Sequence, residues 1–239
     1  YQPQIDAASG KVSGVEALVR WQPKKGSIIP PDEFIPIAEE TGIINDLGRL
    51  VLETGCRQAK QWLDQGTPVR VAINVSAHQF RQLDFTQMVA KVLAETQLPP
   101  ELLELELTES VIMSDASENI ARLGELKGVG ITLAVDDFGT GYSSLSYLRR
   151  FPIDILKIDR SFMCDANSSS DEKAIVEAIL ALAESLKLGV IAEGIERKEQ
   201  VVILNGTHRL LLQGYLFSRP VTANAIPELL RTDFTDLLK

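Results

Sequence analysis

Short apolar runs recur along the chain at a steady interval, and each is about as long as a β-strand. Several are nearly continuous stretches of β-branched residues and leucine, which is typical of parallel strands buried on both faces. The runs are Val12–Val19, Val69–Val75, Leu102–Leu107, Ile131–Val135, Ile153–Ile158, Leu188–Ala192 and Gly214–Phe217. Tyr1–Ile5 is a candidate for one further strand.

Between these runs, apolar residues recur at the i, i+3, i+4 spacing of amphipathic helices. This spacing predicts helices over Asp32–Thr41, Asp46–Gln65, Phe85–Thr96, Ser114–Leu126, Asp171–Leu186 and Arg197–Leu204. Around Ser114, polar residues offer N-caps, and Gly128 is expected to end that helix. Strand and helix thus alternate about eight times, which favours an α/β TIM (β/α)₈ barrel, for which ~250 residues is typical. The alternative, an open doubly wound sheet, is disfavoured because no Gly-x-Gly-x-x-Gly follows the first strand.

Composition and charge narrow the possible chemistry. With 24 Lys+Arg against 33 Asp+Glu, the net charge is −9, so the basic footprint of proteins that bind DNA or RNA duplexes is absent. Two cysteines, Cys56 and Cys164, and two histidines, His78 and His208, are too few for a disulfide framework or a His-rich zinc site. Carboxylate, amide and lysine side chains remain, and these suit hard metal ions.

The ends and apolar runs of the chain predict where the protein resides. No run reaches the ~18 residues of a membrane helix, and the opening Tyr1-Gln2-Pro3 lacks the basic start and apolar core of a secretory signal. We therefore expect residues 1–239 to form a single cytoplasmic domain. Because the sequence opens without Met, we expect it to be excised from a larger multidomain protein, itself a candidate for attachment to the inner membrane.

Polar side chains follow nearly every apolar run at its carboxyl end, which in a TIM barrel is the catalytic face. They are Glu16, Asn74, Glu106 with Glu109, Asp136 with Asp137, Lys157 with Asp159, Glu193 with Glu196, and Gln213. Taken singly, each has an ordinary structural explanation, such as a solvated acid, a snorkelling lysine or a turn aspartate. Together, carboxylates converging on one barrel mouth would repel each other unless divalent cations held by oxygen ligands neutralise them.

Such a set of ligands suggests two-metal phosphoryl chemistry. Two metal ions ~3.5–4 Å apart activate a water molecule and stabilise an in-line displacement at phosphorus. A carboxylate such as Asp136 can bridge two ions, and Asn74 adds an oxygen ligand without further negative charge. Lys157 supplies a fixed positive charge.

These motifs, in this order and over essentially the whole chain, resemble the EAL family of cyclic-di-GMP phosphodiesterases. They are Glu16-Ala17-Leu18-Val19-Arg20-Trp21, flanked by Tyr1-Gln2-Pro3 and segment 31–42, then Asn74-Val75-Ser76 and segments 106–110, 136–145, 156–159, 192–196 and 213–220. The resemblance implies a modified TIM barrel with one antiparallel strand. It also implies hydrolysis of one phosphodiester bond of cyclic-di-GMP to give linear pGpG, with two Mg²⁺ or Mn²⁺ ions per site and inhibition by Ca²⁺.

The resemblance further implies roles for individual residues. The first metal is assigned to Glu16, Asn74, Glu106 and Asp136, and the second to Asp136, Asp137 and Glu193. Lys157 is expected to contact the nucleophilic water, Glu196 and Gln213 to complete the catalytic shell, and Arg20, Gln2 and Asp159 to bind substrate. Glu109 is expected to anchor the loop Asp137–Leu145, which lies near the family's dimer interface, so a homodimer is expected.

One stretch departs from the family pattern, and other functions stay open. Members often carry Gly-Cys-Asp shortly before the position of Gln213; here residues 208–212 read His-Arg-Leu-Leu-Leu, interpreted as a packing and helix-end segment.

An alternative function is a catalytically inactive cyclic-di-GMP receptor, but receptors of that kind usually lack metal ligands or the Asp-Phe-Gly-Thr-Gly loop, which is intact at 137–141. A third possible function is a protein-interaction module built on the same barrel, because a fold does not determine a function. The full-length protein is expected to carry a covalently linked sensor or GGDEF-type domain.

Overall fold

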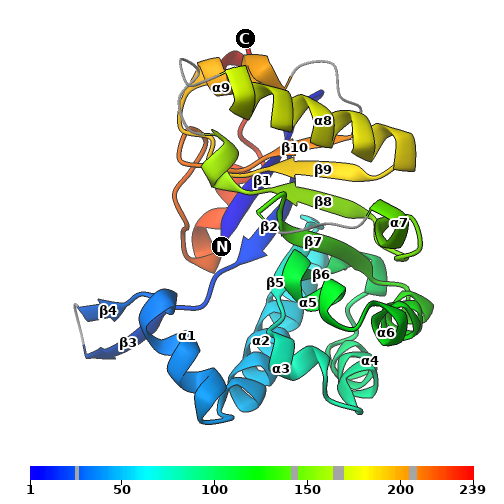
Figure 1. Cartoon of the computed structure of the whole chain (residues 1–239). Helices are drawn as coiled ribbons and strands as arrows, with labels where there is room; N and C mark the ends of the chain where they lie inside the picture. Colours follow the sequence, from blue (N-terminus) through cyan, green and yellow to red (C-terminus); the bar gives the residue numbers. More distant parts are fainter. Residues whose placement is uncertain (25–26, 141–144, 164–169, 205–208) are drawn as a thin grey trace.

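The computed structural model describes residues 1–24, 27–140, 145–163, 170–204 and 209–239. Eight strands in these parts form a closed barrel in the order β1-β10-β9-β8-β7-β6-β5-β2 (Figure 1). They are β1 (Gln2–Asp6), β2 (Val12–Ala17), β5 (Arg70–Asn74), β6 (Leu103–Thr108), β7 (Thr132–Phe138), β8 (Ile155–Ile158), β9 (Gly189–Ala192) and β10 (Leu210–Leu212). Strand β1 pairs antiparallel with β2 and β10, whereas the other neighbours pair in parallel. The expected TIM-like barrel and its antiparallel strand are confirmed.

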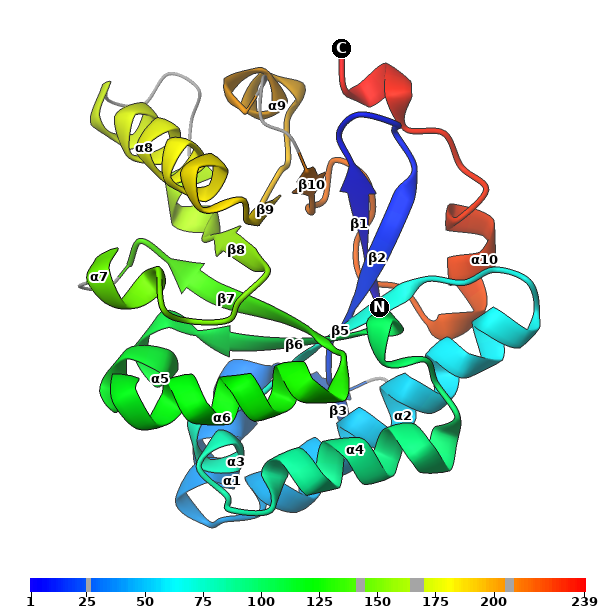
Figure 2. The same cartoon turned by 90° about the vertical axis from the view of Figure 1, so that its right-hand side faces the viewer.

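Helices surround this barrel. They are α1 (Pro31–Glu40), α2 (Ile44–Asp64), α3 (Ala77–Phe80), α4 (Phe85–Thr96), α5 (Glu109–Ser114), α6 (Ala116–Val129), α7 (Leu145–Leu148), α8 (Ser170–Leu186), α9 (Lys198–Ile203) and α10 (Ile226–Leu229). Short 3₁₀ turns lie at Pro100–Leu102, Arg160–Met163, Ala223–Ala225 and Thr235–Leu237. Helices α2, α4 and α6 lie side by side outside the barrel (Figure 2). Within the described ranges, none of the helices has the length and apolar character required to cross a lipid bilayer.

A two-stranded hairpin stands apart from the barrel and was not expected from the sequence. It consists of β3 (Trp21–Lys24) and β4 (Ser27–Ile29), which pair antiparallel. It begins at Trp21, the last residue of the motif that starts at Glu16, and lies beside α1 (Figure 1). The rings of Trp21 and Phe34 contact each other edge to face, with centroids 5.8 Å apart, so the hairpin and α1 form one lobe beside the barrel mouth.

The apolar core is divided by the barrel wall. The larger part lies between strands and helices and includes Trp62, Leu105 and Leu156. A separate small cluster of Ala134, Ile155, Ile191 and Leu211 lies at inward-facing positions of neighbouring strands. Because successive strand residues point to opposite faces, Leu156 packs outward while its neighbours on β8 point into the barrel. Polar residues at the inward positions nearest the carboxyl ends of the strands therefore meet at the barrel mouth.

The last barrel strand lies elsewhere than expected. The structure places it at Leu210–Leu212, so the prediction of a strand at Gly214–Phe217 and of a helix end at 210–212 was wrong. Gly214–Phe217 forms a turn, in which the Ser218 N–H donates to the Gly214 carbonyl. A side chain on Gly214 would overlap the backbone of Ile195, a close tertiary approach that two similar apolar runs cannot reveal.

Two helix ends also differ from prediction, and some expected features lie outside the described residues. Helix α6 ends at Gly130, whose φ of +98° is left-handed, rather than at Gly128. It begins after Asp115, with no side-chain cap from Ser114. Cys164, His208 and residues 141–144 of the loop Asp137–Leu145 lie outside the described parts of the chain.

Candidate active site

Lys157 lies at the centre of a buried polar cluster at the carboxyl end of the barrel. Its side chain is 0% exposed. Its Nζ lies 2.7 Å from Glu106 Oε2, 2.8 Å from Glu193 Oε1, 3.1 Å from Asp136 Oδ1 and 3.9 Å from Glu16 Oε1. Strands β2, β6, β7 and β8, with the residue after β9, bring these five groups together from distant parts of the chain.

Two amides hold the Glu16 carboxylate. Asn74 at the end of β5 donates from Nδ2 to Glu16 Oε1 at 2.6 Å. Gln213, just after β10, donates from Nε2 to Glu16 Oε2. The same nitrogen lies 3.3 Å from Oε1 of Gln2, which donates in turn to the Ser218 carbonyl at 3.2 Å. The barrel therefore gathers Gln2, Asn74 and Gln213 around Glu16.

The cluster holds more buried acid than its lysine can balance. Burial disfavours the Lys157 cation, but Glu106, Glu16, Glu193 and Asp136 outweigh this and hold its pKa well above the usual value. Burial alone would raise the pKa of the Glu16 carboxyl, but the charge of Lys157 and the hydrogen bonds from the two amides outweigh it, so this pKa is lowered. Burial raises the pKa of Glu106 well above normal and that of Glu193 to about 7, against the opposing effect of Lys157. Lys157 therefore stays protonated, while two of the acids resist ionisation.

Divalent cations suit this donor set. The atoms are carboxylate and amide oxygens, the ligands of Mg²⁺ and Ca²⁺, and Glu106 Oε1 is buried without a hydrogen-bond partner among the described residues. Within the same residues, no three His, Cys, Asp or Glu side chains are already arranged around a common metal position. The Lys157 ammonium attracts the carboxylate oxygens instead, so these side chains must turn away from it to hold a metal ion.

A local distortion of β7 places two consecutive aspartates at the barrel mouth. The register of β7 with β8 shifts between Val135 and Phe138. Asp137 there has a φ of +54°, in the left-handed region, and its N–H donates to Asp136 Oδ1 at 2.9 Å. Burial and the charges of Asp136 and Asp159 raise the pKa of the Asp137 carboxyl. A regular strand would point the two side chains to opposite faces.

The other expected site residues lie outside this cluster. Glu109 begins α5, is buried, and accepts a hydrogen bond from the loop after β7. Asp159 follows β8 and accepts the Ser161 N–H at 2.9 Å. Arg20 and Glu196 are exposed, and no hydrogen bond or ion pair between described residues joins either to Lys157 or its carboxylates. Arg20 Nη1 instead donates to the Val19 carbonyl at 2.8 Å.

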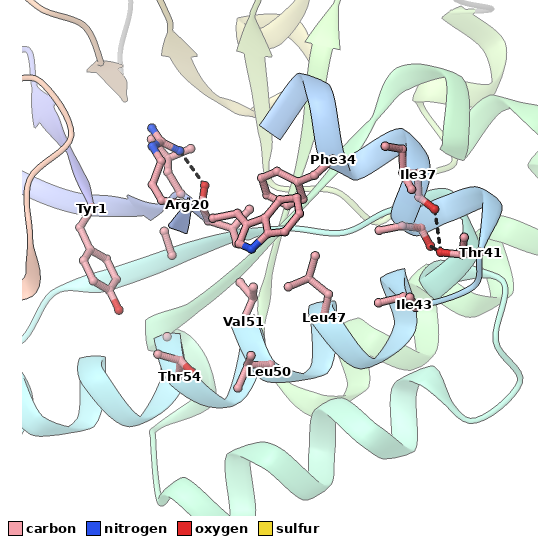
Figure 3. Close-up of a pocket in the computed structure, with 16 residues that line it drawn as sticks. Tyr1, Arg20, Phe34, Ile37, Thr41, Ile43, Leu47, Leu50, Val51 and Thr54 are labelled. Carbon is pink, nitrogen blue, oxygen red and sulfur yellow. Dashed lines mark hydrogen bonds between the residues drawn. The ribbon is translucent and has the colours of Figure 1, made fainter. Parts of the chain in front are cut away.

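An apolar cavity of about 710 Å³ opens beside Arg20, between the end of β2, the hairpin and helices α1 and α2. Figure 3 shows Phe34, Leu47 and Val51 around it, with Arg20 and Tyr1 toward one side. A second cavity, of about 260 Å³, is lined by Arg20 and also by Asn74. Both cavities therefore adjoin Arg20, and the smaller one reaches Asn74, the hydrogen-bond partner of Glu16.

A second polar layer lies one row deeper in the barrel and was not among the expected site residues. It contains Gln4 and Glu104, each 0% exposed, and Arg70, whose Nε lies 3.0 Å from Glu104 Oε2. Burial raises the pKa of the Glu104 carboxyl against the opposing charge of Arg70. The period-two pattern of strands could have identified this layer, because Glu104 and Glu106 share one face of β6.

Comparison with known proteins identifies the relatives of the chain. The EAL domain family model matches residues 1–220. The bifunctional diguanylate cyclase/cyclic di-GMP phosphodiesterase MucR of Pseudomonas aeruginosa is 43% identical over 95% of this chain and 33% of its own length. The cyclic di-GMP phosphodiesterase NbdA of the same organism is 42% identical over 97% of this chain and 30% of its own length.

A third relative and a solved structure extend this comparison. The signaling protein YkoW of Bacillus subtilis is 45% identical over 92% of this chain and 28% of its length. A structure of the PaMucR phosphodiesterase in complex with c-di-GMP superposes with a TM-score of 0.90 at 43% identity, covering 95% of this chain and 92% of that one. The chain thus spans only 28–33% of the length of these three curated relatives.

Proposed function

The chain belongs to the EAL domain family, and from this premise we propose that it is a metal-dependent phosphodiesterase that hydrolyses cyclic-di-GMP to linear pGpG. The observation that carries the proposal is the buried cluster in which four carboxylates surround the single ammonium of Lys157. Relatives named as cyclic di-GMP phosphodiesterases support the choice of substrate. The excess acid of the cluster supports the need for metal ions.

Two divalent cations, Mg²⁺ or Mn²⁺, complete the proposed site. Glu16, Asn74, Glu106 and Asp136 would hold the first ion, and Asp136, Asp137 and Glu193 would hold the second. When bound, such ions activate water and stabilise an in-line displacement at phosphorus. Asp136 is the residue that both proposed ligand sets would share; its Oδ1 contacts Lys157 Nζ at 3.1 Å and accepts the N–H of Asp137 at 2.9 Å.

The remaining residues of the chain position the reactants. Lys157 stays protonated, so it donates a hydrogen bond to the attacking water and orients it rather than removing its proton. Gln213 and Glu196 complete the catalytic shell, and Gln2 and Asp159 contact the substrate. Arg20 presents a planar fork to a phosphate group.

The cavity beside Arg20 suits the rest of a dinucleotide. Its volume of about 710 Å³ and its apolar lining by Phe34, Leu47 and Val51 are typical of sites that bind flat organic groups. A base placed there would leave its phosphate near Arg20, on the side of the cavity toward the β2 terminus (Figure 3). The lobe formed by α1 and the hairpin is therefore assigned to substrate binding.

A single assay tests this function. The purified protein is incubated with cyclic-di-GMP and Mg²⁺ or Mn²⁺, and pGpG is measured by chromatography. EDTA should abolish product formation and either ion should restore it, whereas Ca²⁺ should bind with little turnover because its larger coordination sphere misplaces the water. Full activity in EDTA contradicts the metal mechanism. Binding without product indicates an inactive receptor, and absence of both indicates an interaction module.

We also propose that residues 1–239 work as one domain of a longer signalling protein. The 28–33% coverage of the curated relatives and the two activities in the name of MucR support this proposal. A covalently linked sensor or cyclase-type GGDEF domain would then regulate hydrolysis, and the domain would form a homodimer near the loop Asp137–Leu145. Sedimentation of the protein with and without cyclic-di-GMP tests the dimer.

A further inference from the structure

Gln4 lies in β1, directly beneath the candidate active site. Its side chain is fully buried, and its Nε2 donates a hydrogen bond to Oε1 of Gln213 at 3.1 Å. The Nε2 of Gln213 in turn donates to Oε2 of Glu16. A continuous chain of hydrogen bonds therefore runs from Gln4, which no motif includes, to the signature glutamate.

The contacts with Gln4 and Glu16 together fix which way the Gln213 amide faces. The oxygen of a glutamine amide only accepts hydrogen bonds and its nitrogen only donates, although the two ends have nearly the same shape. With Gln4 donating to Oε1, Gln213 presents its Nε2 to Glu16. A reversed amide would place its oxygen against the Glu16 carboxylate and its nitrogen against the Nε2 of Gln4, so both contacts would become repulsive.

The carbonyl end of the Gln4 amide faces the deeper layer of the barrel, where its Oε1 is buried without a hydrogen-bond partner among the described residues. Gln4 pairs with Gly14 across β1 and β2. A Cβ atom on Gly14 would lie 2.6 Å from Gln4 Oε1 and 3.6 Å from Nε and Nη2 of Arg70. The absence of a side chain at Gly14 therefore makes room for the carbonyl end of Gln4, which lies on the same side as the Arg70 cation. The opposite end of the amide is left to donate to Gln213.

We propose that Gln4 is a positioning residue, which fixes the amide of Gln213 and through it the carboxylate of Glu16. This inference rests on the proposed phosphodiesterase function, because it assigns Gln4 to the geometry of that site. Gln4 touches neither Glu16 nor Lys157 by any hydrogen bond between described residues. Its effect on the reaction must therefore pass through Gln213.

The variant Gln4→Met tests this role, because methionine keeps the length of the side chain and removes its N–H donor. The matched control is Ile5→Val, which trims a neighbouring β1 residue that packs in the outer core. The first measurement is NMR of the Gln213 side-chain amide, whose resonance is assigned by its absence in Gln213→Met. We expect this resonance to shift in Gln4→Met and to stay in place in Ile5→Val.

The second measurement is steady-state hydrolysis of cyclic-di-GMP with saturating Mg²⁺. Gln4→Met should lower kcat by roughly tenfold, which is the loss expected when one buried hydrogen bond is removed. KM should change little. The double variant Gln4→Met/Gln213→Met should be no slower than Gln213→Met alone, because one residue acts through the other. Ile5→Val should keep the wild-type kcat.

The outcomes separate this inference from the proposed function. An unshifted Gln213 resonance in Gln4→Met, or additive losses in the double variant, would overturn the positioning role. If the wild-type protein does not hydrolyse cyclic-di-GMP, the proposed function fails, and the NMR measurement still decides whether Gln4 orients Gln213. If Gln4→Met does not fold, Gln4→Leu removes the same donor with less volume and is judged by the same two measurements.

Discussion

The backbone N–H of Gly139 donates a hydrogen bond of 2.9 Å to Oε2 of Glu109. Glu109 is buried at the first position of α5, and Gly139 follows β7 with a φ of +98°, in the left-handed region. The bond ties the segment that carries Asp137 to the neighbouring strand–helix junction. A charged acceptor makes such a bond stronger than a neutral one, so Glu109 is well placed to restrain this segment.

Glu109→Ala should therefore lose most of the hydrolytic activity although it removes no proposed metal ligand. Without the acceptor, Asp137 is held in the correct position for a smaller fraction of the time, so more metal is needed for half-maximal rate. Titration of activity with Mn²⁺ measures both effects. The control is Glu101→Ala. It removes an exposed carboxylate from the turn that precedes β6, whereas Glu109 follows that strand. Unchanged rates and metal dependence in Glu109→Ala would show that other residues hold the loop.

Lys157→Met should reduce kcat by orders of magnitude and leave metal affinity nearly unchanged. The ammonium contacts Glu106, Asp136 and Glu193 in the structure, but in the proposed reaction it orients water rather than binding the metal ion. Isothermal titration with Mn²⁺ measures affinity, and pGpG formation measures rate. Loss of metal binding together with activity would instead indicate that Lys157 mainly organises the carboxylates.

The stability of the metal-free protein should fall as pH rises from about 5 to about 7.5. Burial raises the folded-state pKa of Glu193 from 4.5 to about 7, so in this window the native state holds a proton that the unfolded state has released. Stability then decreases with rising pH, since the native state binds more protons. Melting temperatures in EDTA at both pH values measure this, and Mg²⁺ should restore the loss at the higher pH.

Glu193→Gln is the matched variant for that measurement, because it keeps the shape of the side chain and cannot ionise. Its melting temperature in EDTA should depend less on pH than that of the wild type. Burial also raises the pKa of Glu106 well above normal, so part of the pH dependence of the melting temperature should remain in this variant. An equal slope in both proteins would mean that Glu193 is not the titrating group.

Much of the barrel and its polar mouth could be predicted from the sequence. The apolar runs identify seven of the eight barrel strands, and parallel pairing then places the residues at their carboxyl ends on one face, as it does for Glu106, Asp136 and Lys157. Hydrophobic periodicity is local, so it carries this information without knowledge of the tertiary contacts.

Other features depend on contacts that no local pattern encodes. The register shift between Val135 and Phe138, with Asp137 in the left-handed region, depends on how β7 meets β8. The period-two pattern could place Glu104 on the inward face of β6, but the meeting of Gln4 with its neighbours depends on strand order, in which β1 pairs antiparallel with β2 and β10. The prediction of the last strand failed at Gly214. The chain turns there, packed against the backbone of Ile195, and the apolar run that follows does not reveal this tertiary contact.

That close approach of Gly214 to Ile195 supports the last prediction. The Ile195 N–H donates to the Gln213 carbonyl at 3.1 Å, and the Leu216 N–H donates to the Ile195 carbonyl at 2.9 Å. A Cβ at position 214 would overlap backbone atoms of Ile195, which cannot move aside as a flexible side chain can. Alanine there must push apart the segments that carry Glu193 and Gln213.

Gly214→Ala should therefore lower the melting temperature by roughly 5–10 °C, near the upper end for single substitutions. It should also lose activity, because Glu193 and Gln213 no longer face the same cluster. Gly124→Ala is the matched control: it lies inside α6 with nothing within 4 Å of the new Cβ, so it should keep activity and raise stability slightly, since alanine favours helix. Differential scanning calorimetry and the pGpG assay measure both variants. A Gly214→Ala protein with wild-type melting temperature and kcat would show that the two segments can separate without disturbing the site.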